Sequence, residues 1–109
     1  MLQNQGQVAF VTGAGGGIGR AIAKKLADLG ASVIVADLNL AGAEETVSML
    51  SNPTGSQKHA AKKLDVTKKV DVQEVMAWVK ENYGGTVTAI TMGLPAAKAI
   101  LREALMGGA

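Results

Sequence analysis

Residues 8–19 read VAFVTGAGGGIG, an apolar run that breaks into five glycines within seven positions and continues as a helical pattern. Because glycine has no Cβ, it lets the backbone approach a ligand closely and permits positive φ. The helix predicted over residues 18–29 directs its free N–H groups and the positive end of its dipole at the same turn. The stretch therefore predicts a binding site for a phosphate group.

The spacing of these glycines separates one phosphate-binding motif from another. The strict G-x-G-x-x-G pattern fails, because counting from Gly13 puts Ile18 at the third glycine and counting from Gly15 puts Arg20 there. A P-loop is excluded because no Gly-Lys pair occurs in the chain. The pattern that fits is T-G-x-x-x-G-x-G, whose fixed positions are Thr12, Gly13, Gly17 and Gly19.

An acid closes the next predicted strand. Residues 32–36 (SVIVA) form a short β-branched run that ends at Asp37, 18 positions after Gly19. A dinucleotide site places a carboxylate here to accept hydrogen bonds from the adenosine ribose hydroxyls. The alternative is a solvated residue at a strand end. Because a carboxylate repels a 2′-phosphate, and neither Ala14 nor Leu38 offers a compensating cation, Asp37 favours NAD over NADP.

Strands and helices alternate along the chain. The predicted strands are residues 8–12, 32–36, 59–64 and 86–91, and the predicted helices are residues 18–29, 41–50, 68–83 and 95–106. The alternation predicts an α/β fold, a partial doubly wound, Rossmann-like parallel sheet of about four strands in the order 3-2-1-4. Cofactors bind where the strand order reverses.

Composition limits the function classes. The 109 residues are 48% hydrophobic but only 3% aromatic, which predicts a single domain with one aliphatic core. With no cysteine and one histidine, zinc and thiol chemistry lack ligands. The formal charge of +2 is dispersed, which argues against nucleic acid as a partner, and no apolar stretch is long enough to span a membrane. Residues 1–7 show no targeting pattern, so we expect an intracellular chain, cytoplasmic or mitochondrial.

Over about residues 6–85 the sequence resembles the short-chain dehydrogenase/reductase family. Residues 12–19 look like its cofactor motif, Asp37 like its ribose-binding acid, and the segment Leu64-Asp65-Val66-Thr67 like the one that meets the adenine ring. The stretch from Ala36 to Thr67 is similar to the branch of type 8 17-beta-hydroxysteroid dehydrogenases and 3-oxoacyl-carrier-protein reductases. This resemblance implies NAD-dependent oxidoreduction of hydroxyacyl, 3-oxoacyl or hydroxysteroid substrates.

The resemblance also implies a set of nucleotide-binding residues. They are Thr12, Gly13, Gly15, Gly16, Gly17, Ile18, Gly19, Asp37, Leu38, Asp65, Val66, Met92 and Gly93. The glycines would shape the turn around the pyrophosphate, Ile18 would offer a backbone N–H, and Asp65 with Val66 would border the adenine. The implied cofactor is NAD, with AMP or FAD as alternatives, because only the adenosine half of the site is fully present.

The catalytic motifs of the family do not follow in this chain. Family members continue with Asn-Asn-Ala-Gly, a catalytic Ser and Tyr-x-x-x-Lys, whereas here Met92-Gly93-Leu94-Pro95 follows the last strand. The only tyrosine, Tyr83, has Val87 four positions later, and we interpret it as a packing residue; the only histidine, His59, is expected at the surface. We therefore assign no catalytic residue and no metal ligand, and expect the isolated chain to be inactive.

Residues 86–109 form an atypical terminal strand and helix within one truncated Rossmann-type domain, residues 1–109. Residues 87–105 weakly resemble a segment of the electron-transfer flavoprotein beta subunit that lies near a bound AMP. A shortened gene product, a fusion and a divergent half-domain all stay open. The alternative function is an AMP- or ADP-binding module, or a ligand-free one without enzymatic activity. An exposed edge of the last strand would invite self-association.

Overall fold

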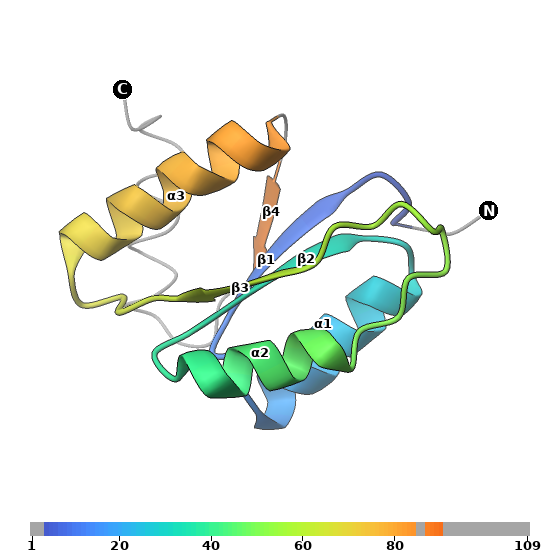
Figure 1. The fold of residues 1–109 in the computed structure, drawn as a ribbon, viewed down its shortest axis with the longest axis horizontal. Coiled ribbons are helices and arrows are strands. Elements are labelled where there is room, and N and C mark those ends of the chain that lie inside the picture. Colours follow the sequence, from blue (N-terminus) through green and yellow to red (C-terminus); the bar gives the residue numbers. More distant parts are fainter. Residues whose placement is uncertain (1–3, 85–86, 91–109) are drawn as a thin grey trace.

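The computed structural model describes residues 4–84 and 87–90, and its centre is a parallel sheet of four strands (Figure 1). The strands are β1 (Val8–Thr12), β2 (Ser32–Asp37), β3 (Ala60–Lys63) and β4 (Val87–Ile90), in the order β3-β2-β1-β4. The helices are α1 (Gly17–Asp28), α2 (Leu40–Ser48) and α3 (Lys69–Tyr83). The predicted α/β class, parallel sheet and strand order are confirmed.

The helices cover both faces of the sheet. In Figure 1, α1 and α2 lie on one side and α3 on the other. Successive residues of a strand point to opposite faces, so Val33 and Val35 pack with the α1 and α2 side, whereas Phe10 and Ile34 pack with the α3 side. Strands buried on both faces explain why residues 8–12 and 32–36 read as continuous apolar runs rather than alternating ones.

The two layers differ in the size of their side chains. The α1 and α2 layer contributes small buried residues, Ala23, Ala27 and Ala43, which let these helices lie close to the sheet. The α3 layer buries larger groups against Phe10, which is fully buried. Removing a side chain such as phenylalanine from water stabilises the fold by about 1.5–3 kcal/mol. Helix α1 is therefore held against the sheet by the close approach of its backbone, whereas α3 is held by the packing of large side chains.

Element boundaries differ from the predictions by one or two residues. Strand β3 begins at Ala60 rather than at residue 59, because the ring of His59 accepts a hydrogen bond from Val33 N–H (3.0 Å) beside the first ladder positions. Helix α2 ends at Ser48 rather than at residue 50. The predicted helix over residues 95–106 lies outside the described residues. No helix among the described residues is long and apolar enough to cross a membrane.

Helix α1 starts directly against the turn that precedes it. A Cβ built on Gly19 would lie 2.3 Å from the carbonyl oxygen of Gly13, far inside van der Waals contact. Only a glycine allows this crossing of helix and turn. Gly19 therefore fixes the position of α1 relative to β1.

We expect Gly19→Ala to lower the free energy of unfolding by about 1–3 kcal/mol, because the new methyl group must displace backbone. Urea denaturation followed by far-UV circular dichroism measures this. Gly16→Ser is the matched control, since Gly16 has an extended φ of 173° and a Cβ there meets nothing within 4 Å. Equal stabilities of the two variants would contradict this packing.

Candidate functional site

The glycine turn connects β1 to α1 at the carboxyl end of the sheet. Gly13 and Gly17 have φ values of +67° and +57°, the left-handed region that glycine adopts without strain. Gly13 N–H still bonds to the Ala36 carbonyl (2.9 Å), so the turn starts beside the end of β2. The N-cap residue Gly16 supplies no side-chain acceptor to the helix. The N-cap side chain therefore occupies none of the first N–H groups of α1, which is compatible with an anion at this end of the helix.

Asp37 is held against this turn by two backbone donors. Its Oδ2 accepts a hydrogen bond from Gly15 N–H (2.9 Å) and its Oδ1 accepts one from Asn39 N–H (2.9 Å). Each carboxylate oxygen can accept a further hydrogen bond. The side chain is half-buried, so it remains accessible. Asp37 can therefore accept two hydroxyl groups of a ligand in one orientation.

The position of Gly15 depends on the absence of a side chain. A Cβ built there would lie 2.9 Å from both Cγ and Oδ2 of Asp37. A larger residue would push the carboxylate away and lengthen its hydrogen bond to the backbone. Gly15 therefore brings turn and acid together, a role that the spacing of the motif alone does not reveal.

Two exposed apolar side chains flank the turn and the acid. Ile18, in the first turn of α1, is 70% exposed, and Leu38, directly after Asp37, is 62% exposed. Large apolar groups gain free energy when a ligand removes them from water. Thr12, by contrast, is buried at the end of β1. Ile18 and Leu38 form apolar walls beside the polar groups.

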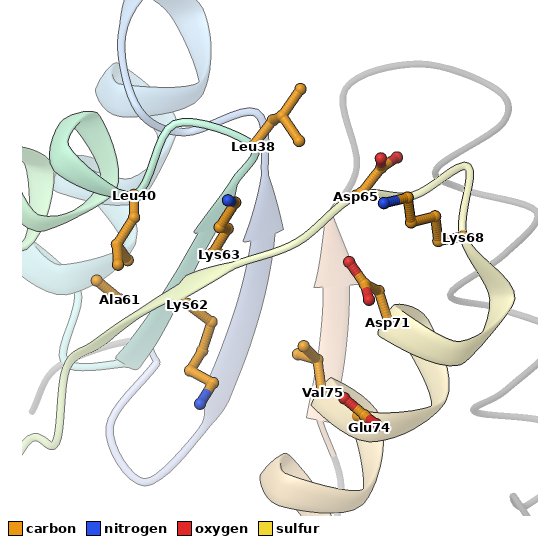
Figure 2. Close-up of a pocket in the computed structure, with 10 residues that line it drawn as sticks. All are labelled: Leu38, Leu40, Ala61, Lys62, Lys63, Asp65, Lys68, Asp71, Glu74 and Val75. Carbon is orange, nitrogen blue, oxygen red and sulfur yellow. The ribbon is translucent and has the colours of Figure 1, made fainter.

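Leu38 also belongs to a cavity of about 550 Å³ between β3 and α3 (Figure 2). Asp65 lies on the opposite wall, and its carboxylate accepts hydrogen bonds from the hydroxyl and the backbone N–H (3.0 Å) of Thr67. The Thr67 hydroxyl, its backbone N–H and the nearby lysines lower the pKa of Asp65 below its usual value of 3.8. The carboxylate is therefore charged at neutral pH and can accept hydrogen bonds.

The remaining predicted site residues do not all meet in this cavity. Val66 packs against the core under α3 and does not line the cavity. Met92 and Gly93 lie outside the described residues. Among residues 4–84 and 87–90, no group of three or more His, Cys, Asp or Glu side chains could hold a metal ion. The residues that the structure brings together are those of the turn, Asp37 and Leu38, with Asp65 across the cavity.

A family model of the short chain dehydrogenases matches residues 7–93. The chain belongs to this family. It is 42% identical over 79 residues to the uncharacterized oxidoreductase YuxG of Bacillus subtilis, covering 72% of this chain and 12% of that protein. It is 49% identical over 72 residues to the (3R)-3-hydroxyacyl-CoA dehydrogenase of Rattus norvegicus, covering 61% of this chain and 27% of that one.

Solved structures of short-chain dehydrogenases share the fold. One from Burkholderia phymatum, in complex with NAD, superposes with a TM-score of 0.67 at 32% identity, over 79% of this chain and 30% of that one. The chain thus spans about a third or less of the length of these relatives. Residues 4–84 and 87–90 contain four parallel strands of such a sheet.

Tyr83 and His59 both have structural partners. Tyr83 packs edge-on against Trp78, with ring centroids 5.8 Å apart, and donates its hydroxyl to the Lys58 carbonyl (2.9 Å). Burial raises its pKa, whereas a catalytic tyrosine of this family would need a lowered one. His59 links β2 to the loop between α2 and β3. Its Nδ1 accepts a hydrogen bond from Val33 N–H, and its Nε2 is 2.8 Å from the Ser51 carbonyl. These contacts explain both residues without catalysis.

Sequence reasoning missed a cation beside Asp37. Lys63 is the register partner of Asp37 on β3, and Figure 2 shows it in the cavity beside Leu38. The neighbouring Lys62 is held elsewhere, with its Nζ 4.3 Å from the centre of the Trp78 ring. The signal was available in principle, since the parallel register of two strands aligns positions 37 and 63. To predict this pair from the sequence, the exact strand boundaries must be known, and the sequence defines them only to within a residue or two.

The bond from Thr67 to Asp65 predicts a pH dependence of stability. Because folding lowers the pKa of Asp65, its contribution is present above about pH 4 and is lost as the pH falls through the folded value. Thr67→Val removes the hydroxyl, so stability should rise less between about pH 2 and about pH 6 than in the wild type. Urea unfolding across this range measures the effect. Thr54→Val, which removes a hydroxyl that contacts Ser56 rather than a carboxylate, should keep the wild-type profile.

Proposed function

We propose that this chain binds NAD as the nucleotide-binding part of a short-chain dehydrogenase. The observation that carries the proposal is the carboxylate of Asp37, held at the mouth of the glycine turn by Gly15 N–H and Asn39 N–H. In this position its oxygens would accept the adenosine ribose hydroxyls. The turn beside it would take the pyrophosphate on the N-terminus of α1.

The cavity of Leu38 and Asp65 would hold the adenine. Leu38 offers an exposed apolar surface to the ring, and the Asp65 carboxylate offers an acceptor for its exocyclic amine. Leu38 follows directly after β2 and Asp65 lies two positions after the end of β3, at the carboxyl edge where a parallel sheet binds ligands. The adenosine half of a dinucleotide would thus be bound by described residues alone.

Asp37 favours NAD over NADP in this proposal. A 2′-phosphate would face the carboxylate at short range, and its repulsion is strong where water is partly excluded. Lys63 lies on the neighbouring strand and would offset part of that repulsion. The Burkholderia phymatum relative was solved in complex with NAD, which supports the same cofactor here. We propose NAD as the preferred nucleotide, with NADP bound more weakly.

The activity of the whole protein would be hydride transfer between NAD and a hydroxyacyl, 3-oxoacyl or hydroxysteroid substrate. The similarity to the rat protein, a (3R)-3-hydroxyacyl-CoA dehydrogenase, supports the first of these classes. When bound, NAD would supply the hydride acceptor. The present 109 residues contain no Tyr-x-x-x-Lys, and the hydroxyl of the sole tyrosine is bonded to the Lys58 carbonyl. We therefore propose that this chain alone binds the cofactor without catalysing its reduction.

A second candidate is an AMP or ADP binder without preference for nicotinamide. This candidate is supported by the arrangement of the site, since Asp37, Leu38 and Asp65 would all contact the adenosine part of a nucleotide. The two candidates differ in one measurable quantity. A dinucleotide site binds NAD more tightly than AMP, whereas a site for adenosine alone binds the two with similar affinity.

Titration calorimetry with NAD, NADP, AMP and FAD tests the proposal. We expect NAD to bind best and Asp37→Ala to weaken its binding roughly ten- to a hundredfold, because charge-assisted hydrogen bonds contribute about 1.5–3 kcal/mol. Glu44→Ala, which removes an exposed carboxylate from α2, is the matched control and should bind as the wild type does. Unchanged affinity in Asp37→Ala would show that the ribose assignment is wrong.

The absence of catalysis has its own test. Purified chain mixed with NADH and a 3-oxoacyl or ketosteroid substrate should show no loss of NADH absorbance, because the sequence holds no Tyr-x-x-x-Lys to protonate the carbonyl oxygen. Gly17→Val, which puts a branched side chain at a φ of +57°, serves as the control for cofactor-dependent signal. Oxidation by the wild type that disappears in Gly17→Val would overturn this part of the proposal.

A further inference from the structure

Helix α2 is bonded to the glycine turn through the side chain of Arg20. Its Nε donates to the hydroxyl of Thr46 (2.8 Å), and its Nη2 donates to the carbonyl of Gly15 (2.9 Å). Thr46 in turn donates its hydroxyl to the carbonyl of Ala14 (2.6 Å). Two side chains from two helices thus bind two consecutive carbonyl groups of the turn.

The bond from Thr46 acts on the same peptide group that holds Asp37, and the bond from Arg20 acts on the next peptide group along the chain. The Ala14 carbonyl and the Gly15 N–H belong to one planar trans peptide, so they point in opposite directions. Thr46 binds the oxygen of this peptide, and Asp37 accepts from its N–H (2.9 Å). Rotation of the peptide would break both bonds at once. The hydroxyl of Thr46 therefore helps to set the direction of the donor that orients the carboxylate.

The contact is buried and closely packed. Thr46 and Ala14 are fully buried, and the Arg20 side chain is 23% exposed. A Cβ on Gly42 of α2 would lie 2.8 Å from the Gly15 carbonyl oxygen, so α2 approaches the turn as closely as backbone allows. Hydrogen bonds shielded from water are stronger than exposed ones, and chained bonds polarise each other. The outer ion pair of Arg20 with Glu45 (3.4 Å) is exposed and contributes little.

We infer that Arg20 and Thr46 are positioning residues of the nucleotide site, which act on the ligand through Gly15 and Asp37. The inference rests on the proposed function. Neither side chain needs to touch the nucleotide. Their effect is to keep the Asp37 carboxylate directed at the ribose hydroxyls, so their loss would reduce the preference for ligands that carry those hydroxyls.

The test compares AMP with 2′,3′-dideoxy-AMP on the full chain by titration calorimetry. The wild type should prefer AMP, and Asp37→Ala should abolish that preference. Thr46→Val and Arg20→Lys should each reduce the preference about two- to tenfold, the range expected for one hydrogen bond. Added to Asp37→Ala, either change should reduce it no further, because the carboxylate through which they act is gone.

Matched variants separate positioning from general loss of structure. Thr46→Ser keeps the hydroxyl and should restore the wild-type preference. Lys24→Ala removes an exposed cation from α1 and should alter both affinities equally, because both ligands carry the same phosphate. A variant that merely loosens the fold weakens AMP and its dideoxy analogue alike. Where Thr46→Val does not fold, hydrogen exchange of the Gly15 amide in Arg20→Lys tests the same role. We expect this amide to exchange faster in Arg20→Lys than in the wild type.

The outcomes distinguish this inference from the proposed function. Suppose that folded Thr46→Val and Arg20→Lys keep the wild-type preference for AMP over 2′,3′-dideoxy-AMP, while Asp37→Ala loses it. This result would overturn the role of Arg20 and Thr46 and leave the nucleotide site intact. Unchanged exchange of the Gly15 amide in Arg20→Lys would count against them in the same way. Absence of any nucleotide binding by the wild type would overturn the proposed function, and this inference with it.

Discussion

The hydrogen bond from Gly15 N–H to the Asp37 carboxylate joins the two parts on which the candidate site depends. It requires that β1 and β2 end side by side, which their register provides by pairing Thr12 with Ala36. It also requires a residue without a Cβ at position 15. A charged acceptor bonded to backbone N–H is among the stronger hydrogen bonds in proteins. The turn and the Asp37 carboxylate therefore hold their relative orientation without a bound ligand.

The surrounding layers serve this arrangement in different ways. The alanine-rich side of the sheet brings α1 and α2 close enough for Arg20 and Thr46 to reach the carbonyl groups of the turn. The opposite side, built around Phe10, gives α3 its place and completes the cavity that Asp65 lines. Small residues therefore allow the backbone segments to approach each other, and large residues stabilise the fold by their packing. The reason is that the dispersion attraction between atoms falls steeply with the distance between them.

The cavity lined by Leu38 and Asp65 carries charged side chains of both signs. Lysines at positions 62, 63 and 68 line it together with Asp65, Asp71 and Glu74 (Figure 2). Lys62 stacks on Trp78, which leaves Lys63 as the cation aligned with Asp37. Coulombic attraction to a phosphate and repulsion from a carboxylate therefore act at neighbouring positions. The preference between NAD and NADP would depend on the balance of the two.

The amino-acid sequence by itself determined the element order, the parallel sheet and the positions of the turn and the acid, because glycine spacing and apolar runs act locally. Tertiary structure alone decided which groups meet across the fold. The contact of Thr46 with Ala14 spans 32 positions and that of Arg20 with Thr46 spans 26, and neither side chain carries a local signal. The packing of the partly buried Val66 against the core around Phe10 is likewise a contact that only the tertiary structure reveals. The contacts of Thr46 and Arg20 depend on the approach of α2 to the turn, which is set by packing across the whole layer.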